Sequence, residues 1–212
     1  KIMILLLKKL YPDVPVIIGG IEASMRRLSH YDYWQDTLRP SILIDSKADI
    51  LVYGMGEKPI LEIANYLRDG KQISELTDIP QTAICVNASN IPEHLDSEKE
   101  ELLHSHEECL KDKKLHAANF KVIEIESNKW QGRTLWQKVG NRAVKVNGTN
   151  PPLSESEIDS SFDLPYTRLP HPRYRGKRIP AYEMIRHSVN MHRGCFGGCS
   201  FCTISAHQGK FI

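Results

Sequence analysis

Three cysteines stand within eight residues near the carboxyl end of the chain, in the stretch CFGGCSFC at 195–202. Cys195, Cys199 and Cys202 follow a C-x3-C-x2-C pattern, and its spacers are short enough for all three sulfurs to face one point. Three glycines within 194–198 let the backbone bend sharply and bring its N–H groups close to the sulfurs. The pattern therefore predicts a loop that folds around a metal ion or a cluster.

The number of cysteines bears on which metal group is bound. A structural zinc site needs four ligands, so zinc here would require His192 or His207 as the fourth. An iron–sulfur cube held by three thiolates leaves one iron open for a substrate or cofactor. The spacing, the glycines and an aromatic residue before the last cysteine favour the cube over zinc, and zinc over a disulfide.

The same stretch, with Phe201 immediately before Cys202, resembles the signature of the radical S-adenosylmethionine enzymes. The resemblance implies that Cys195, Cys199 and Cys202 each bind one iron of a [4Fe–4S] cluster. It also implies that the fourth iron chelates the amino and carboxylate groups of S-adenosylmethionine, and that Phe201 lies near the adenine. Reductive cleavage would then give methionine and a 5′-deoxyadenosyl radical, which abstracts a hydrogen from the substrate.

Three longer stretches narrow the resemblance. Residues 19–36, GGIEASMRRLSHYDYWQD, residues 45–60, DSKADILVYGMGEKPI, and residues 190–212, which contain the cysteines, together resemble the YgiQ-type radical S-adenosylmethionine proteins. The function of that group is largely uncharacterised, so the resemblance implies an enzyme of unknown substrate and unknown catalytic residues, with a reducing donor such as flavodoxin or ferredoxin. It also implies that a catalytic barrel follows the cysteine strand. We therefore expect this chain to be an N-terminal piece that is inactive alone.

Two glycine turns are further candidate sites. Gly19-Gly20 and the segment 54–57 each follow an expected parallel strand, where open α/β sheets bind ligands. We interpret them as tight turns. They resemble the later half of a cobalamin-binding domain, but the Asp-x-His-x-x-Gly motif that supplies the cobalt ligand is absent, which argues against cobalamin.

Other chemically interesting residues receive ordinary interpretations. We expect the cluster of charged and aromatic residues within 26–34 to be a solvated helix running into a packed aromatic loop: Arg26, Arg27, His30, Tyr31, Asp32, Tyr33 and Trp34. The basic stretch 168–178 is interpreted as a solvated arm. Its alternative is a binding module in which that arm holds RNA or protein and the cysteine loop is structural, with zinc or a cluster. Cys85 and Cys109 are expected to be ordinary, whereas His192 and Arg193 are candidates to support the cluster loop.

Composition limits the classes of partner. Among 212 residues, 28 Lys plus Arg against 26 Asp plus Glu give a net charge of +2, which predicts no strong attraction to nucleic acid or to an anionic membrane. The apolar run at 2–7 is too short to span a bilayer. Five cysteines without a secretory signal fit a reducing compartment, so we expect a cytoplasmic protein.

The elements that position the cysteines are predicted to form an α/β fold. Apolar runs at 14–18 and 49–53 predict parallel strands of a partial doubly wound sheet, similar to flavodoxin or cobalamin-binding domains. A helix is expected from Pro59 to Asp69, with an apolar face of Ile60, Ile63, Ala64 and Leu67 and with Gly70 after its end. The run at 2–7 predicts a buried helix, and a second helix is expected to extend through Leu28.

From residue 79 the pattern changes to α+β. Strands are expected at 82–86 and 120–126, with a charged helix from Ser97 to Leu115 capped by Ser97 and Glu100. The proline-rich stretch at 148–187 predicts an extended arm, and 188–194 predicts the first strand of a truncated radical S-adenosylmethionine barrel. The expected domains are therefore 1–78, 79–147, 148–187 and 188–212.

Overall fold

A computed structural model describes residues 2–212. The chain forms two compact units, one of residues up to Pro151 together with Gly194–Phe211, and one of Pro152–Arg193 together with Ile212. The strands and the cysteine loop all belong to the first unit. The second unit is described separately below.

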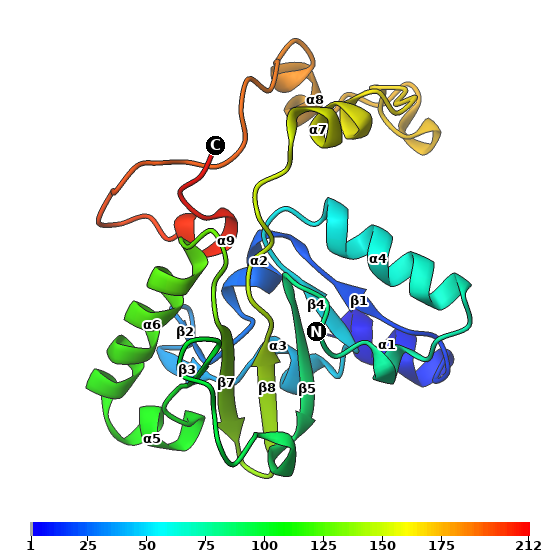
Figure 1. Ribbon diagram of the computed structural model, residues 1–212. Helices are drawn as coiled ribbons and strands as arrows, with labels where there is room; N and C mark the ends of the chain where they lie inside the picture. The colour runs from blue at the N-terminus through cyan, green and yellow to red at the C-terminus, as the bar shows by residue number, and fades with distance from the viewer. Residues whose placement is uncertain (1) are drawn as a thin grey trace. The chain divides into compact units, whose positions relative to one another are not determined.

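Within the described residues, six strands form one mixed sheet in the order β1-β4-β5-β8-β7-β6 (Figure 1). The strands are β1 Ile17–Ile18, β4 Ile50–Val52, β5 Thr82–Asn87, β6 Glu100–Leu102, β7 Thr134–Val139 and β8 Arg142–Val146. A separate antiparallel hairpin pairs β2 His30–Asp32 with β3 Thr37–Arg39. The division of the chain into domains 1–78, 79–147, 148–187 and 188–212 stays a prediction. Strands from residues 1–78 and from residues 79–147 lie in this one sheet.

Helices follow or precede most strands of the sheet. They are α1 Ile2–Leu10, α2 Gly20–Met25, α3 Ile42–Ser46, α4 Glu57–Arg68, α5 His106–Lys111, α6 Lys113–Ser127 and α9 Ser205–Gln208. Short 3-10 turns occupy Ile73–Glu75 and Ala88–Asn90. Among residues 2–212, no helix combines the length and apolar character that crossing a membrane requires.

The expected parallel pair is confirmed, because β1 and β4 pair in parallel with Ile17 opposite Ile50. The rest of the sheet differs from a parallel doubly wound arrangement. Strand β5 pairs antiparallel to β4, β8 antiparallel to β5 and β7 antiparallel to β8, while β6 and β7 are parallel. The two-residue connection between β7 and β8 requires an antiparallel hairpin, whereas a parallel pair needs a long crossover.

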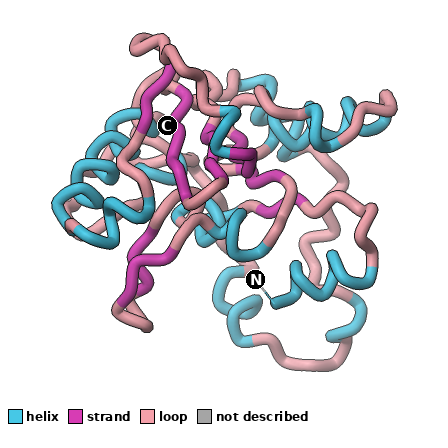
Figure 2. The backbone as a smooth tube through the Cα atoms, turned by 90° about the horizontal axis from the view of Figure 1, so that it is seen from below, coloured by secondary structure: helices cyan, strands magenta, loops and turns pink. Residues whose placement is uncertain are grey.

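Both faces of the sheet are buried, as the alternation of side chains along β4 demonstrates. Ile50 and Val52 pack in a cluster with Ile63 of α4, whereas Leu51 packs in a second cluster with Leu43 of α3. Successive strand residues point to opposite faces, so a continuous apolar strand indicates helices on both sides. Figure 2 shows helices and loops around the strands of this unit.

The helix expected over 59–69 is confirmed as α4, and it ends before Gly70, whose φ of 84° is the left-handed value that favours glycine. Its expected apolar face is only half correct. Ile63 is fully buried and Leu67 packs beside it, but Ile60 is 43% exposed and Ala64 is exposed. The buried face is therefore narrower than the sequence pattern indicated.

The strand expected at 82–86 is confirmed as β5, but two other expectations for 79–147 are wrong. Residues 120–126 lie inside helix α6, because Asp112 caps the helix start and Ile123, Glu126 and Ser127 are buried at helical spacing. The helix expected from 97 begins later. Ser105 forms the capping box with Glu108, and strand β6 occupies Glu100–Leu102.

The amino-terminal helix exists as α1, but its predicted burial is wrong. It has no buried residue, and Ile4 is its one described side chain that packs against the core. The following helix, α2, ends at Met25 rather than Leu28, and the chain then turns into the β2–β3 hairpin.

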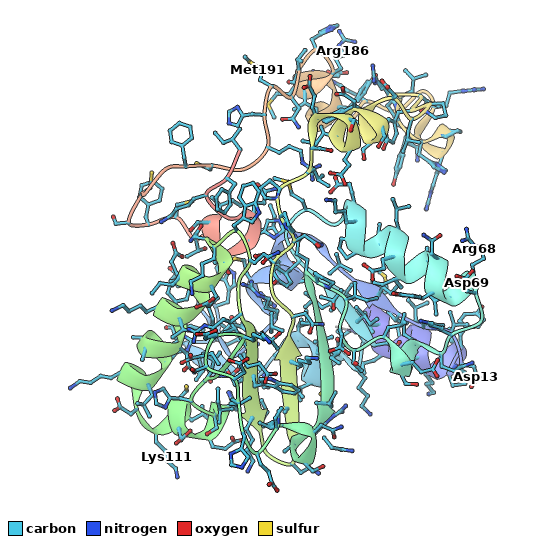
Figure 3. The ribbon with its side chains drawn as sticks, viewed as in Figure 1. Asp13, Arg68, Asp69, Lys111, Arg186 and Met191 are labelled. Carbon is cyan, nitrogen blue, oxygen red and sulfur yellow. The ribbon has the colours of Figure 1, made fainter. Side chains whose placement is uncertain are left out.

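The second unit is more regular than the expected extended arm. Helix α7 spans Glu155–Phe162 and starts with a capping box between Ser154 and Glu157. Helix α8 spans Pro180–Ile185, and a 3-10 turn covers Pro172–Tyr174. The strand expected at 188–194 is absent from the described residues: the stretch has no regular structure, and Met191, labelled in Figure 3, is 89% exposed. With no partner strand, its apolar side chains have no sheet to join.

Candidate metal and cofactor site

The cysteine loop presents its three thiols to solvent. Cys195, Cys199 and Cys202 are free and exposed. The Gly197 N–H donates a hydrogen bond to Cys195 Sγ at 3.4 Å, and a Cβ built on Gly197 would lie 3.3 Å from Cys195 Sγ and 3.9 Å from Cys199 Sγ. The missing side chain at Gly197 thus leaves room beside two of the three sulfurs.

The donor set fits an iron–sulfur cluster in number and in chemistry, because three unpaired thiols stand on one short loop. Among residues 2–212, however, no three His, Cys, Asp or Glu side chains are grouped closely enough to hold a metal ion. The three sulfurs are therefore not already arranged as a closed metal site in this part of the chain.

The other residues singled out near the loop differ in their surroundings. Phe201 is 88% exposed, so its ring is available to a ligand, and His192 is exposed as well. His207, the alternative zinc ligand, lies in α9 and is buried. Burial, and secondarily the nearby Arg27, lower the pKa of His207.

The segment after the loop is anchored to the body of the unit. Helix α9 lies against the end of α6 (Figure 1), where Ser205 Oγ donates to Glu124 Oε1 at 2.8 Å and Lys210 Nζ lies 3.6 Å from the same oxygen. The Phe211 ring meets Trp130 edge-on at a centroid distance of 5.7 Å. These contacts fix the chain three residues beyond Cys202.

Helix α9 also approaches the turn that follows β4. Gly54 has a φ of 67°, and a Cβ there would lie 2.5 Å from Gln81 Nε2 and 3.1 Å from the His207 carbonyl oxygen. A cavity of about 460 Å³ lies alongside, bordered by both glycine turns, Gly19-Gly20 and 54–57. The interpretation of Gly54 as a tight turn agrees with this geometry, and the turn gives α9 its close approach to the sheet.

The expectation that Arg27 is solvated is wrong. Its side chain is 3% exposed, and its guanidinium lies 4.6 Å above the Tyr53 ring. Nη1 donates to the Ser24 carbonyl at 2.7 Å and Nη2 donates to Ser127 Oγ at 2.9 Å. Burial lowers the pKa of Arg27 and raises that of Tyr53 to about 12. Arg27 therefore connects its own segment, which includes Ser24, with Tyr53 after β4 and with Ser127 at the end of α6.

The aromatic part of the 26–34 cluster is not packed as expected. Tyr33 and Trp34 lie at the tip of the β2–β3 hairpin, contact each other edge-on at 5.6 Å and are largely exposed. The hairpin has no partner strand among the described residues beyond its own pair. Its tip therefore has no neighbouring element to cover the two rings.

The remaining cysteines lie in the body of the unit. Cys85 is half-buried on β5, and Cys109 is buried on α5, where Asn119 Nδ2 donates to its sulfur at 3.2 Å. Burial raises the pKa of both thiols. In the second unit, the arginines and lysine of 168–178 are exposed, and Arg178 pairs with Glu183 at 2.9 Å.

Comparison with known proteins identifies relatives of the whole chain. It is 60% identical over 207 residues to a UPF0313 protein of Porphyromonas gingivalis, covering 98% of this chain and 32% of the relative. It is 57% identical over 218 residues to a UPF0313 protein of Bacteroides thetaiotaomicron, covering 98% of the chain and 35% of the relative. The UPF0313 protein YgiQ of Escherichia coli is 43% identical over 255 residues, with coverages of 97% and 34%.

The chain thus spans about a third of the length of these curated relatives. No solved structure matches it. The family model described as "Radical SAM N-terminal" matches residues 2–188, a range that ends before the cysteine loop. Together with the YgiQ-type relatives, this match means that the chain belongs to the radical SAM N-terminal family.

Proposed function

We propose that the whole protein is a radical S-adenosylmethionine enzyme and that this chain supplies the cysteines that hold its [4Fe–4S] cluster. The observation that carries the proposal is the cysteine loop, with three free, exposed thiols within eight residues and a glycine beside two of them. Membership of the radical SAM N-terminal family supports the same reading.

The chain's own residues have separate roles in this proposal. Cys195, Cys199 and Cys202 provide thiolates, and the exposed Phe201 ring offers a stacking surface for the adenine of S-adenosylmethionine. When bound, the cluster and S-adenosylmethionine supply one-electron reductive cleavage and a carbon radical able to remove a hydrogen atom from a substrate. Helix α9 holds the end of the loop in place.

Electrons for this chemistry come from outside the chain in our proposal. The exposed loop suits delivery by a small reducing protein such as flavodoxin or ferredoxin, and the five free cysteines suit a reducing compartment such as the cytoplasm. Residues 1–212 lack the Asp-x-His-x-x-Gly motif, so the proposal assigns no cobalt ligand to this chain.

The test uses the full-length protein, reconstituted anaerobically with iron and sulfide. We expect about four irons and four sulfides per chain, as the cube requires, and release of 5′-deoxyadenosine when a reductant and S-adenosylmethionine are added. Replacing any one of Cys195, Cys199 or Cys202 by alanine should abolish both. Phe201→Ala should keep the iron but weaken S-adenosylmethionine binding.

Cys85→Ser is the matched control, because Cys85 lies on β5, away from the loop in sequence. It should leave iron content and cleavage nearly unchanged. Tightly bound zinc without sulfide would overturn the proposal in favour of a structural cysteine loop. So would loop variants that cleave S-adenosylmethionine as well as the wild type does.

A further inference from the structure

A cavity of about 330 Å³ lies next to the end of the cysteine loop. Thr203, which follows Cys202 directly, forms part of its wall together with Ala206 of α9. The opposite walls come from the segment 25–31 and from α6. Its volume is within the range of small-molecule pockets, about 300–1,000 Å³.

One wall of this cavity carries a buried cation without a counter-ion. Arg27 lines the cavity, and the titratable side chain that acts on it among the described residues is Tyr53, whose ring it covers at 4.6 Å, and not a carboxylate. Its two terminal nitrogens donate to Ser24 and Ser127, but its buried Nε has no hydrogen-bond partner. A buried charge left without an ionic partner is costly, and an anion in the cavity would offset that cost.

The net charge of the cavity lining is about +1 and comes from Arg27, because the other charged and titratable groups around it are paired or neutral. Arg26 pairs with Glu22 at 3.3 Å at the rim. Burial lowers the pKa of His30 and of His116, which favours the neutral form of both imidazoles. Asp32 and Asp45 act on His30 from outside the lining. One uncompensated guanidinium fits a monoanion better than a dianion.

The rest of the lining is apolar, with one further polar group. Met25, Leu28, Phe120 and Ile123 supply carbon surface suited to an aliphatic or aromatic body. His116 also lines the cavity and is half-buried, so its ring can offer a neutral hydrogen-bonding group to a ligand, and its buried Nδ1 has no partner within the described residues. The lining therefore combines one carboxylate-binding group, one neutral hydrogen-bonding group and an apolar surface.

We infer that this cavity binds a small carboxylate with an apolar body, held through Arg27 and His116. Its role as the substrate pocket rests on the proposed function, because only that function places the reacting group beside the cysteine loop. The binding itself does not depend on a cluster and can be measured without one.

The test titrates the full-length protein with 4-phenylbutanoate and with its neutral analogue, 4-phenylbutanamide, by calorimetry and by nuclear magnetic resonance of the histidine rings. The carboxylate should bind at least 10-fold more tightly than the amide and should shift the His116 resonances, because a charge-assisted hydrogen bond corresponds to about 10- to 100-fold in affinity. Equal binding of the two probes, or tighter binding of phenyl phosphate, would overturn the inference.

Arg27→Met removes the charge at nearly constant length and should weaken 4-phenylbutanoate at least 10-fold. Arg142→Met, an exposed arginine on β8 outside this cavity, is the matched control and should change the affinity less than 2-fold. If Arg27→Met fails to fold, His116→Leu should still weaken the probe by about 3- to 10-fold, as the loss of one neutral hydrogen bond predicts. Unchanged affinity in the folded variants would refute the site.

Iron content and S-adenosylmethionine cleavage, measured on the same preparations, separate the two hypotheses. An intact cluster without carboxylate binding refutes this inference alone. Carboxylate binding by a protein that cannot assemble a cluster leaves the binding site standing and refutes the proposed function.

Discussion

Replacing Gly54 by alanine tests whether the turn after β4 has to accept α9 at close range. Gly54 adopts a φ of 67°, and its missing Cβ would lie 2.5 Å from Gln81 Nε2 and 3.1 Å from the His207 carbonyl oxygen. Gln81 is itself buried, and its amide donates to the carbonyls of Tyr53 at 3.3 Å and Met55 at 3.4 Å. An added methyl group would displace this amide and press on α9.

The expected cost has two parts. A left-handed conformation costs a non-glycine residue about 1–2 kcal/mol. Loss of the two hydrogen bonds of Gln81 adds about 0.5–1.5 kcal/mol each. The free energy of unfolding should therefore fall by about 2–5 kcal/mol, which corresponds to about 4–20 °C in melting temperature for a protein of this size. Thermal unfolding followed by circular dichroism measures it.

Gly70→Ala is the matched control, because Gly70 has a φ of 84° and nothing within 4 Å of its missing Cβ. It should cost only the backbone part, about 1–2 kcal/mol. Amide exchange in 205–208 should accelerate in the Gly54 variant and stay unchanged in the Gly70 variant. The reasoning is refuted if the two variants are equally stable, or if α9 exchanges alike in both.

Two further predictions concern groups at the end of α6 and the reactivity of the thiols. Burial alone would raise the pKa of Glu126, but hydrogen bonds from Arg133 and Lys129 outweigh it and lower the pKa below its ordinary value of 4.5. The stabilisation by ionised Glu126 is therefore present above pH 4.5 and is lost as the pH falls through its lower pKa in the folded protein. Glu126→Gln should lower the free energy of unfolding by about 2–3 kcal/mol near neutral pH. Denaturant unfolding at a series of pH values should show that the variant loses less stability on acidification than the wild type does. In brief alkylation without metal, read by peptide mass spectrometry, Cys195, Cys199 and Cys202 should react before Cys85 and Cys109, since burial raises the pKa of the latter two; equal labelling of all five would contradict this.

The elements predicted correctly are those whose signals are local. The apolar runs before Gly19 and Gly54 each indicated a parallel strand, although β1 covers only Ile17–Ile18 of the expected 14–18, and the proline, apolar spacing and Gly70 of α4 indicated a helix with defined ends. Strand direction beyond β4 was not predictable in this way. It depends on which strands pair, and that is decided by contacts between distant parts of the chain.

The predictions that are wrong concern segments whose local sequence is compatible with two different secondary structures or two different helix starts. FKVIEIE at 120–126 is rich in β-branched residues, which favour strands, yet it also places Ile123 and Glu126 three residues apart on one helix face. Ser97 with Glu100 and Ser105 with Glu108 both have capping-box spacing, and only the second forms the box. Tertiary packing decided between the alternatives in each case.

The residues of the candidate site also differ in whether their importance depends on local sequence or on contacts between distant segments. The cysteines of 195–202 can be proposed as ligands from the sequence because that proposal depends only on their spacing along the chain. Arg27 could not be identified in this way, since its contact with Ser127 joins residues 100 positions apart. The available signal was its position in ASMRRL, three and four residues after Ser24 and Ala23, which are small and allow close packing. An arginine beside such residues is a candidate for burial.

The contacts of α9 explain how an exposed loop can still be held in a defined place. Ser205 and Lys210 bind Glu124, His207 lies on the Gly54 turn, and Gly209 lies so close to α6 that a Cβ would be 3.0 Å from the Ser127 carbonyl. Cys195, Cys199 and Cys202 themselves are exposed. If the loop binds the proposed cluster, its carboxyl-terminal end is held by these contacts, so substitutions that loosen α9 should impair cluster retention without removing any ligand.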